Sequence, residues 1–336
     1  MNMIVTNENI MIAIKIPTYN SEITILDTLE SIINQTYANY TVYIFDNCST
    51  DNTLEIIASL NDNRIKIIKS EKNYGWAWNF NRCLNPTGEE MMLFAHSDDI
   101  YHPSFLEINL KQSLLQQNSL IFSKGIYFKN KKEVYGRLTK INDSIQIDEY
   151  SSYEDLLNKV VTNGNFIFCP TAFGKSEIFS TVIGKFNESD FKGSADLDAW
   201  LRVSKLHSVT IIKKPILFFY RLSNNQISYW DRKKSDSYFA RCINFHVQSL
   251  TNLNIKKDLS FYIRWHEIYH SIFVNIDEIN CSKLFFFSSI YEVIKLKVKF
   301  LKKFKLLGLL CISLIIILFP YKIRLKLNSL ILRISR

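Results

Sequence analysis

The sequence predicts an α/β protein with a mainly parallel sheet flanked by helices, followed by an α-helical carboxyl-terminal region. Three observations predict it. Apolar runs of strand length alternate with runs whose apolar residues recur at helical spacing. The 336 residues, 47% of them hydrophobic, can bury a full core in one large domain plus an appendage. From Tyr229 onward the pattern becomes all-helical, so we expect one domain over residues 1–228 and a helical region over residues 229–336.

The expected elements follow in order from these two patterns. Strands are predicted where apolar residues run together or alternate with polar ones: residues 10–16, 41–45, 64–68, 91–95, 120–128, 209–212 and 216–220. Helices are predicted where apolar residues recur every three or four positions: residues 22–35, 53–60, 75–84, 103–117, 153–161 and 195–206. Pro17 ends the first strand, and Pro103 begins the fourth helix. Residues 129–152 are polar without a strong period, which predicts a mobile loop.

The formal charge of +9 belongs to the carboxyl-terminal tail. Residues 291–336 hold eleven Lys or Arg and the single acid Glu292, a net of +10, so the other 290 residues sum to −1. This distribution argues against nucleic acid as a partner. Six widely spaced cysteines without a C-x-x-C pair favour reduced thiols over disulfides or a zinc site, and the first residues lack a signal-peptide pattern. We therefore expect a cytoplasmic protein.

An apolar run that ends in two adjacent carboxylates is the most informative motif. Residues 91–95 are followed closely by Asp98 and Asp99. Open α/β folds bind ligands at the carboxyl ends of their strands, where carboxylates suit Mg²⁺ or Mn²⁺ holding a diphosphate. Such a cation withdraws charge from a leaving diphosphate. The alternative is that these acids only cap the helix that begins near Pro103.

Three further segments place charged residues at the ends of elements. Asp46 ends a strand and begins a turn rich in Asn, Ser and Asp, which could bind a ligand or only cap a helix. Asp196 and Asp198 lie two apart at the start of a helix and point roughly 200° apart. One of them could face a cleft as a base while the other caps or pairs locally. Arg221 ends a strand and could hold phosphate or form an ordinary surface ion pair.

Six segments in order resemble the family-2 inverting glycosyltransferases, which have the A-type nucleotide-sugar transferase fold (GT-A). They cover two thirds of the chain: I-P-T-Y-N (16–20), D-N-C-S-T-D-N-T (46–53), K-N-Y-G through Asn81 (72–81), H-S-D-D (96–99), A-D-L-D-A-W-L-R (195–202) and Y-R through Ser228 (220–228). The six segments follow one another in the same order as in the family, which makes the resemblance strong.

The resemblance implies roles for individual residues. Those expected to bind a nucleotide-diphosphate-sugar donor are Pro17, Thr18, Asn20, Asp46, Asn73, Asp98 and Arg221. Asp98 would hold a divalent metal, Mn²⁺ or Mg²⁺, with His96 and Asp99 as further candidate ligands. Asp196 would be the catalytic base that removes the proton of the acceptor hydroxyl. A single displacement then inverts the anomeric centre without a protein nucleophile.

Three positions depart from the family's pattern. His96 stands where the first Asp is usual, Ala195 replaces the acid before the base, and Ser223 replaces a closing-segment His that is often a metal ligand. A second interpretation therefore stays open. The chain could be a non-catalytic sugar-nucleotide-binding or scaffold protein of a polysaccharide assembly complex.

Two other patterns favour ordinary packing over chemistry. Residues 266–270, H-E-I-Y-H, match a zinc-site pattern, but no further His follows them to complete a site. The aromatic residues Tyr74, Trp76, Trp78 and Phe80 alternate along a short segment. They could stack on a sugar, although packing against the sheet is the favoured interpretation.

The basic tail, residues 291–336, predicts an anionic membrane surface as a partner. Residues 306–319 form a 14-residue run without charge, with Lys or Arg on both sides. A bilayer span needs about 20 apolar residues, so we expect peripheral attachment at the inner face of the cell membrane. A buried terminal helix with solvated lysines is the alternative.

Together these observations predict a metal-dependent, inverting glycosyltransferase. It would move one sugar from a nucleotide-diphosphate sugar to a glycan or polyprenyl-linked acceptor in the biosynthesis of a surface polysaccharide such as O-antigen or capsule. A sugar-phosphate nucleotidyltransferase would need a glycine-rich phosphate loop, which residues 16–21 lack.

Overall fold

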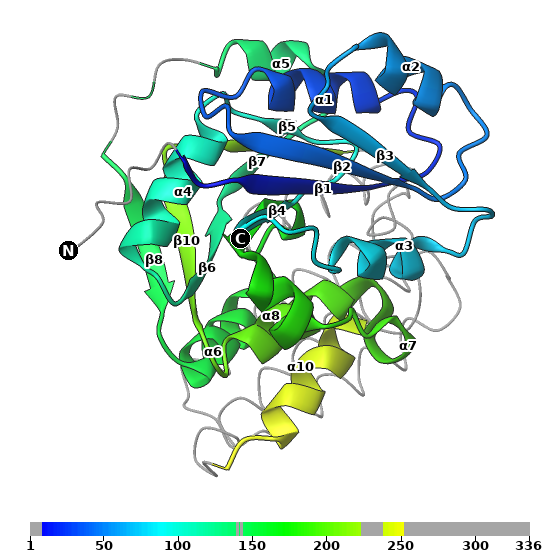
Figure 1. Cartoon of the computed structure of the whole chain (residues 1–336). Helices are drawn as coiled ribbons and strands as arrows, with labels where there is room; N and C mark the ends of the chain where they lie inside the picture. The colour runs from blue at the N-terminus through cyan, green and yellow to red at the C-terminus, as the bar shows by residue number, and fades with distance from the viewer. Residues whose placement is uncertain (1–8, 139–140, 142–143, 223–237, 252–336) are drawn as a thin grey trace, which may run out of the picture. The chain divides into compact units, whose positions relative to one another are not determined.

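The computed structural model describes residues 9–138, 141, 144–222 and 238–251 (Figure 1). The chain divides into two compact units. The first comprises the described residues up to 157 together with 165–222, and the second comprises residues 158–164 and 238–251. Within these described ranges, no helix is long and apolar enough to cross a membrane. Four features considered in the sequence lie outside these described ranges: Ser223, the expected boundary near Ser228, residues 266–270 and the tail.

The larger sheet has eight strands in the order β3-β2-β1-β4-β9-β6-β10-β8. Its strands are β1 (Ile12–Thr18), β2 (Tyr40–Asp46), β3 (Ile65–Lys69), β4 (Met91–Phe94), β6 (Ser119–Ser123), β8 (Gln146–Tyr150), β9 (Ala172–Lys175) and β10 (Ser208–Lys214). The neighbours β3–β2, β2–β1, β1–β4 and β6–β10 are parallel, whereas β9 and β8 pair antiparallel with their neighbours. The predicted mainly parallel sheet is confirmed.

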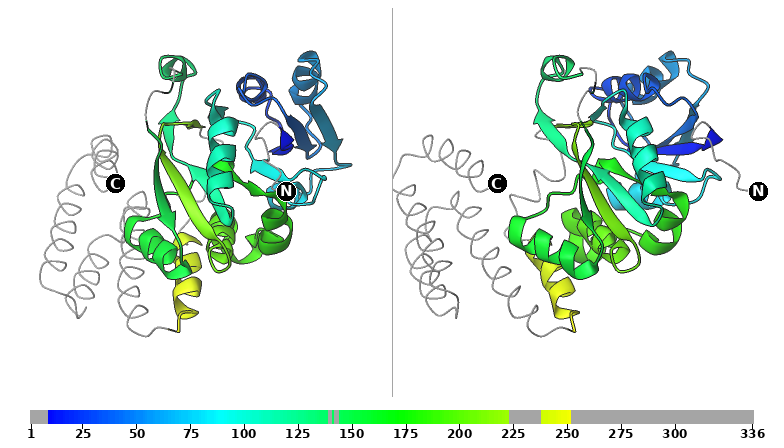
Figure 2. Two further views of the ribbon diagram at one scale, coloured as in Figure 1. Left: turned by 60° about the vertical axis from the view of Figure 1, so that its left-hand side comes forward. Right: turned by 90° about the vertical axis from the view of Figure 1, so that its left-hand side faces the viewer.

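The predicted helices are present on both faces of this sheet. They are α1 (Ile25–Ile33), α2 (Thr53–Ser59), α3 (Trp76–Cys83), α4 (Phe105–Leu115), α6 (Tyr153–Asn163) and α8 (Ala195–Val203). Helices α1 and α2 lie on one side of β1 to β3, and α3 and α8 lie on the other (Figures 1 and 2). In the second unit, α10 (Tyr238–Gln248) agrees with the expected helical pattern after residue 229.

The predicted single strand over residues 120–128 is wrong, because the chain changes sheets at Lys124. Strand β6 lies in the larger sheet, while β7 (Gly125–Phe128) joins a three-stranded sheet ordered β5-β11-β7, with β5 at Ile100–Tyr101 and β11 at Phe218–Arg221. A Cβ at Gly125 would lie 2.6 Å from the Phe218 ring, so β7 and β11 approach closely only because this residue is glycine. The small sheet brings the end of β11 beside the segment that follows β4.

The prediction of a loop over residues 129–152 is also wrong in part. This stretch contains α5 (Lys132–Tyr135) and the strand β8, which pairs antiparallel with β10 at the edge of the larger sheet. An edge strand needs no continuous apolar run, so its sequence Q-I-D-E-Y gives no strand signal. Strand β9 and the short helix α7 (Glu188–Phe191) were likewise not predicted.

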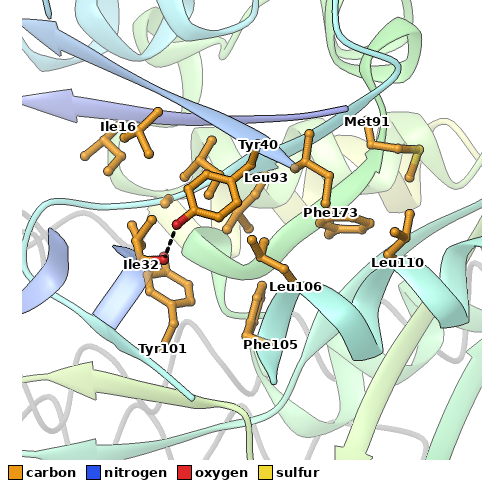
Figure 3. Packing of buried hydrophobic residues seen from close by; sticks show 14 of the residues in the cluster. Ile16, Ile32, Tyr40, Met91, Leu93, Tyr101, Phe105, Leu106, Leu110 and Phe173 are labelled. Carbon is orange, nitrogen blue, oxygen red and sulfur yellow. Dashed lines mark hydrogen bonds between the residues drawn. The ribbon is translucent and has the colours of Figure 1, made fainter. Parts of the chain in front are cut away.

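One hydrophobic core lies between the larger sheet and helices α1 and α4 (Figure 3). Leu93 of β4 packs there with Phe105, Leu106 and Leu110 of α4, and the Tyr40 hydroxyl donates a 2.9 Å hydrogen bond to the Ile32 carbonyl. This packing fixes the strands whose carboxyl ends carry the polar residues described next.

Candidate active site

The carboxyl ends of β1, β2 and β4 lie side by side at one edge of the larger sheet. Thr18 stands opposite Asp46 in the β1–β2 register, and the Ala95 amide, just after β4, donates to the Lys15 carbonyl at 3.0 Å. The polar residues that end these strands therefore lie at one edge of the sheet.

Asp46 is buried, and its carboxylate organises the turn that follows β2. One carboxylate oxygen accepts the amides of Cys48 and Ser49 at 3.1 and 3.2 Å. Asn20 joins the same turn through its Oδ1, which accepts the Thr50 amide at 2.8 Å. Asp46 therefore supports its own turn, and its contact with a nucleotide stays a prediction, as does that of Pro17 and Asn20.

Two asparagines of this edge were not singled out from the sequence. Asn47 is buried, and its Nδ2 donates to Asn73 Oδ1 at 2.8 Å, which orders the loop before α3. Asn79 is buried on α3, and its Nδ2 donates to the carbonyls of Phe45 and Thr18 at 2.7 and 3.3 Å. The available signal in the sequence was the Asn79 side chain, an amide that stands among the aromatic residues of α3. A buried amide group must find hydrogen-bond partners, so this position could have been recognised.

His96, Asp98 and Asp99, which we call the acid cluster, offer ligand atoms that all lie within 4.8 Å of one another. Asp99 is fully buried, and its Oδ1 accepts the Arg221 amide at 2.9 Å. Among the described residues, Asp99 Oδ2 and His96 Nε2 are buried without a hydrogen-bond partner. Burial, and then the charge of Asp98, raises the pKa of Asp99 well above its ordinary value, while burial lowers that of His96.

The acid cluster fits a divalent cation. Carboxylate and imidazole groups are ligands of Mn²⁺ and related ions, and a bound cation would both satisfy the two unpartnered buried atoms and favour the ionised carboxylates. An unpartnered buried polar atom is otherwise costly.

Helix α1 holds the backbone of the acid cluster in place. Its hydroxyl groups bond to alternate residues of the segment 97–101: Thr24 Oγ1 to the Ser97 carbonyl at 2.9 Å, Thr28 Oγ1 to the Asp99 carbonyl at 2.8 Å, and Ser31 Oγ from the Tyr101 amide at 3.1 Å. Helix α4 begins at Phe105 with Ser104 at its N-cap position. Asp99 therefore does not cap α4, and that alternative is wrong for this residue.

Arg221 reaches the same segment from β11. Its Nε donates to the Asp98 carbonyl at 2.7 Å, and its Nη2 donates to Asp27 of α1 at 2.8 Å. Only 12% of its side chain is exposed, so this is not the ordinary surface ion pair considered above. The guanidinium joins α1, β11 and the acid cluster, and its contact with a donor phosphate stays a prediction.

The two acids at the start of α8 have separate environments, as expected. Asp198 is buried and pairs with Arg202 Nε at 2.9 Å, and Arg202 also donates to the Ile183 and Lys185 carbonyls at 2.6 and 2.7 Å. Asp196 accepts the Leu197 amide at 2.7 Å, and burial raises its pKa to about 6. A carboxyl group with that pKa is ionised at neutral pH and basic enough to accept a proton.

Asp196 and Asp99 act on one buried thiol. Burial, and then the charges of Asp196 and Asp99, raises the pKa of Cys169. Almost 100 residues of sequence separate the two acids, so the fold brings both within electrostatic range of Cys169.

The alternating aromatic residues divide into two groups. Phe80 packs on Phe94 and His96, with ring centroids 5.3 and 5.2 Å apart, which confirms packing against the sheet for this residue. Tyr74 and Trp78 instead stack on each other at 4.3 Å and remain 42% and 39% exposed.

This fold, with an acid cluster after β4 and a separate acid at the start of α8, defines a transferase of the GT-A class. Residues 13–182, half of the chain, match the model of Glycosyl transferase family 2. The chain belongs to this family and is a glycosyltransferase.

Curated relatives cover most of the described chain. The UDP-Glc:α-D-GlcNAc-diphosphoundecaprenol β-1,3-glucosyltransferase WfgD of Escherichia coli is 27% identical over 223 residues, which are 66% of this chain and 81% of WfgD. The putative teichuronic acid biosynthesis glycosyltransferase TuaG of Bacillus subtilis is 28% identical over 225 residues, which are 66% of this chain and 83% of TuaG.

Solved structures agree in fold. TarS 1–349 of S. aureus in complex with UDP superposes with a TM-score of 0.55 at 20% identity, covering 76% of this chain and 72% of that one. The mannosyltransferase PcManGT of Pyrobaculum calidifontis, in complex with GDP-Man and Mn²⁺, has a TM-score of 0.57 at 12% identity, covering 95% and 83%. At these identities the likeness establishes the GT-A fold alone.

Proposed function

We propose that this glycosyltransferase is metal-dependent and inverting, and that it transfers one sugar from a UDP-sugar to a lipid-linked saccharide at the inner face of the membrane. The observation that carries the proposal is the acid cluster, whose buried Asp99 Oδ2 and His96 Nε2 have no hydrogen-bond partner among the described residues.

The acid cluster would hold Mn²⁺ or Mg²⁺ through Asp98, with Asp99 and His96 as further ligands. When bound, the cation supplies charge stabilisation to the leaving diphosphate. Thr28 and Arg221 fix the backbone that carries these ligands, through hydrogen bonds to the Asp99 and Asp98 carbonyls. The cation ligands are thereby held in position before the donor binds.

Asp196 would act as the general base. Its carboxylate takes the proton of the acceptor hydroxyl as that oxygen attacks the anomeric carbon from the face opposite the diphosphate. A pKa of about 6 supports this role, because the group is ionised near neutral pH. Asp198 is already committed to Arg202, so it does not compete for the acceptor proton.

The activities for which relatives are named support the choice of substrates. WfgD uses UDP-Glc and an acceptor linked to undecaprenyl diphosphate, and so does the Escherichia coli enzyme WfaP, which is 32% identical over 118 residues. An acceptor of this kind resides in the membrane, which suits a role in surface-polysaccharide biosynthesis and the basic, partly apolar sequence of residues 291–336.

The test is binding of UDP and of a panel of UDP-sugars to the purified protein, with Mn²⁺ or with EDTA. We expect Mn²⁺-dependent binding that Asp98→Ala abolishes and that Glu55→Ala, an exposed acid on α2, leaves unchanged. Equal binding in EDTA would contradict the metal dependence. Binding without transfer to any saccharide diphospholipid would favour the scaffold interpretation.

A further inference from the structure

A hollow of about 480 Å³ opens between the start of α3 and the segment that leads into α7. One wall carries the aromatic side chains of Tyr74, Trp76 and Trp78. The facing wall carries polar and charged residues, among them Lys185 and Glu188. The volume lies in the range of small-molecule sites, and the contrast between the walls suits a ligand with both apolar and hydroxyl-bearing surfaces.

Specific contacts fix both walls. Asn81 of α3 accepts the Phe186 amide at 2.7 Å, which ties the facing segment to the aromatic wall. Trp78 stacks on Tyr74 at 4.3 Å and lies 4.7 Å from the Arg82 guanidinium, which itself donates to a β3 carbonyl at 2.9 Å. The exposed rings are thus held in one arrangement, so a ligand would lose little free energy in ordering them.

The hollow adjoins the acid cluster through one aromatic ring. The Phe80 ring lies 5.3 Å from the Trp76 ring on one side and 5.2 Å from the His96 ring on the other, measured between centroids. A ligand against Trp76 would therefore be separated from the proposed cation site by a single side chain.

The hollow also adjoins the helix that carries the proposed base. Phe186 packs on Trp200 of α8, with ring centroids 6.0 Å apart. Trp200 follows Asp196 by four residues, so the two side chains lie on the same face of α8. The nucleotide contacts expected of Thr18 and Asp46 lie instead at the ends of β1 and β2. The hollow thus neighbours the helix that carries the proposed base.

We infer that this hollow binds a saccharide unit of the acceptor, whose C–H faces pack against Trp76 and Trp78 and whose hydroxyl groups reach Lys185 and Glu188. The inference rests on the proposed transferase function. It adds a site and a substrate class: a sugar ring of a diphosphate-linked acceptor.

The experiment measures two dissociation constants by calorimetry in the presence of Mn²⁺. The first is for UDP. The second, measured with UDP present, is for diphosphate lipids that carry GlcNAc, GalNAc or glucose on a short polyprenyl chain. For the lipid that the unaltered protein binds most tightly, Trp78→Ala and Trp76→Ala should each weaken binding on the order of tenfold, because the contact between an aromatic ring and the sugar is lost. Trp78→Phe should retain most of the affinity. UDP binding should change less than about twofold in every variant.

Two further variants control for effects on folding and on aromatic surface in general. Lys185→Ala, on the facing wall, should weaken lipid binding without lowering the melting temperature, since its side chain is exposed. Tyr135→Ala removes an aromatic residue that is 57% exposed on α5 and should leave both constants unchanged.

Four results would overturn the inference. Weaker UDP binding with unchanged lipid binding would assign the hollow to the donor. Unchanged lipid binding in all wall variants would show that the hollow is not used, while the proposed transferase would stand. Failure of the unaltered protein to bind UDP would contradict the proposed function and this inference together. Binding of UDP but of none of the lipids would contradict the inference and the lipid-linked acceptor, while the UDP-sugar donor would stand.

Discussion

Replacing Asp196 by asparagine should separate catalysis from stability. Asparagine has the same shape, and its Oδ1 can keep the 2.7 Å hydrogen bond from the Leu197 amide. It cannot accept a proton from an acceptor hydroxyl. Loss of a general base lowers kcat by about 10²- to 10⁴-fold, so we expect the variant to bind UDP normally but to transfer sugar at least about a hundredfold more slowly.

The same carboxyl group should set the acid limb of the pH profile. Burial raises its pKa from 3.8 to about 6, and only the ionised form can act as a base. In the unaltered enzyme, kcat/KM should therefore be flat above pH 7 and fall about tenfold per pH unit below 6. The limb near pH 6 should be absent from the residual activity of the Asp196→Asn variant.

The raised pKa also predicts the direction of the stability change. Because the folded-state pKa is raised, the contribution of Asp196 to stability is greatest below pH 3.8 and is lost as the pH rises through about 6. The full difference between these two pKa values corresponds to about 3 kcal/mol at pH 8, an upper value because Asp196 is partly exposed. Asparagine carries no charge, so the variant should be more stable than the unaltered protein by about 1 to 3 kcal/mol at pH 8 and not at pH 3.5.

Urea unfolding at both pH values and a radiolabelled-sugar transfer assay measure these effects. Asp198→Asn is the matched control, since it changes the neighbouring acid that pairs with Arg202, and it should lose stability at pH 8. Undiminished transfer by Asp196→Asn would refute the assignment of the base. A variant less stable than the unaltered protein at pH 8 would refute the electrostatic reasoning.

Three other substitutions test how the site is supported. Arg202→Met removes the ion-pair partner of the buried Asp198 and the donor to three carbonyl groups, so urea unfolding should show a loss of about 3 to 5 kcal/mol. Thr28→Val keeps the shape of a fully buried side chain but removes its 2.8 Å hydrogen bond to the backbone of the acid cluster. We expect the free energy of unfolding to fall by about 1 to 2 kcal/mol and Mn²⁺ binding, measured by calorimetry, to become several-fold weaker. Gly125→Ala places a Cβ 2.6 Å from the Phe218 ring and should cost about 1 to 3 kcal/mol, seen as a lower melting temperature.

Each of these substitutions has a paired control. Arg202→Lys keeps a charge beside Asp198 and should recover part of the lost stability, whereas an equal loss in both variants would argue against the ion pair. Thr28→Ser keeps the hydroxyl and should bind Mn²⁺ normally. Gly136→Ala has open space around its Cβ and should leave the melting temperature unchanged, so equal effects at both glycines would contradict the steric argument.

Strands β1, β2 and β4 were predictable because they are buried on both faces. The run 91–95 and its neighbours therefore consist almost entirely of apolar residues, and Pro17, Asp46 and Asp98 mark where such runs end. The meeting of these ends at one edge follows from parallel pairing. Sequence alone thus located the acid cluster, while the donor contacts expected of the neighbouring residues stay predictions.

The remainder depended on partners distant in sequence. Thr24, Thr28 and Ser31 are polar residues on a helix, and nothing local indicates that their hydroxyl groups face the acid cluster instead of water. The split at Lys124 falls within the polar break S-K-G (123–125), but nothing in that break indicates that the two halves of the run join different sheets. Such features follow from tertiary packing, which overrides local signals.

The contacts of Arg221 have a consequence for the order in which the protein becomes functional during synthesis. Its amide and guanidinium bond to Asp99 and Asp98 across 122 and 123 residues of chain. Domains fold as the ribosome releases them, and contacts this far apart in sequence form last. A nascent chain that has exposed β1 to β4 can pair these parallel strands, yet its acid cluster acquires the anchor from Arg221 only after residue 221 leaves the exit tunnel. The proposed cation binding would therefore begin only once most of the glycosyltransferase fold has been translated.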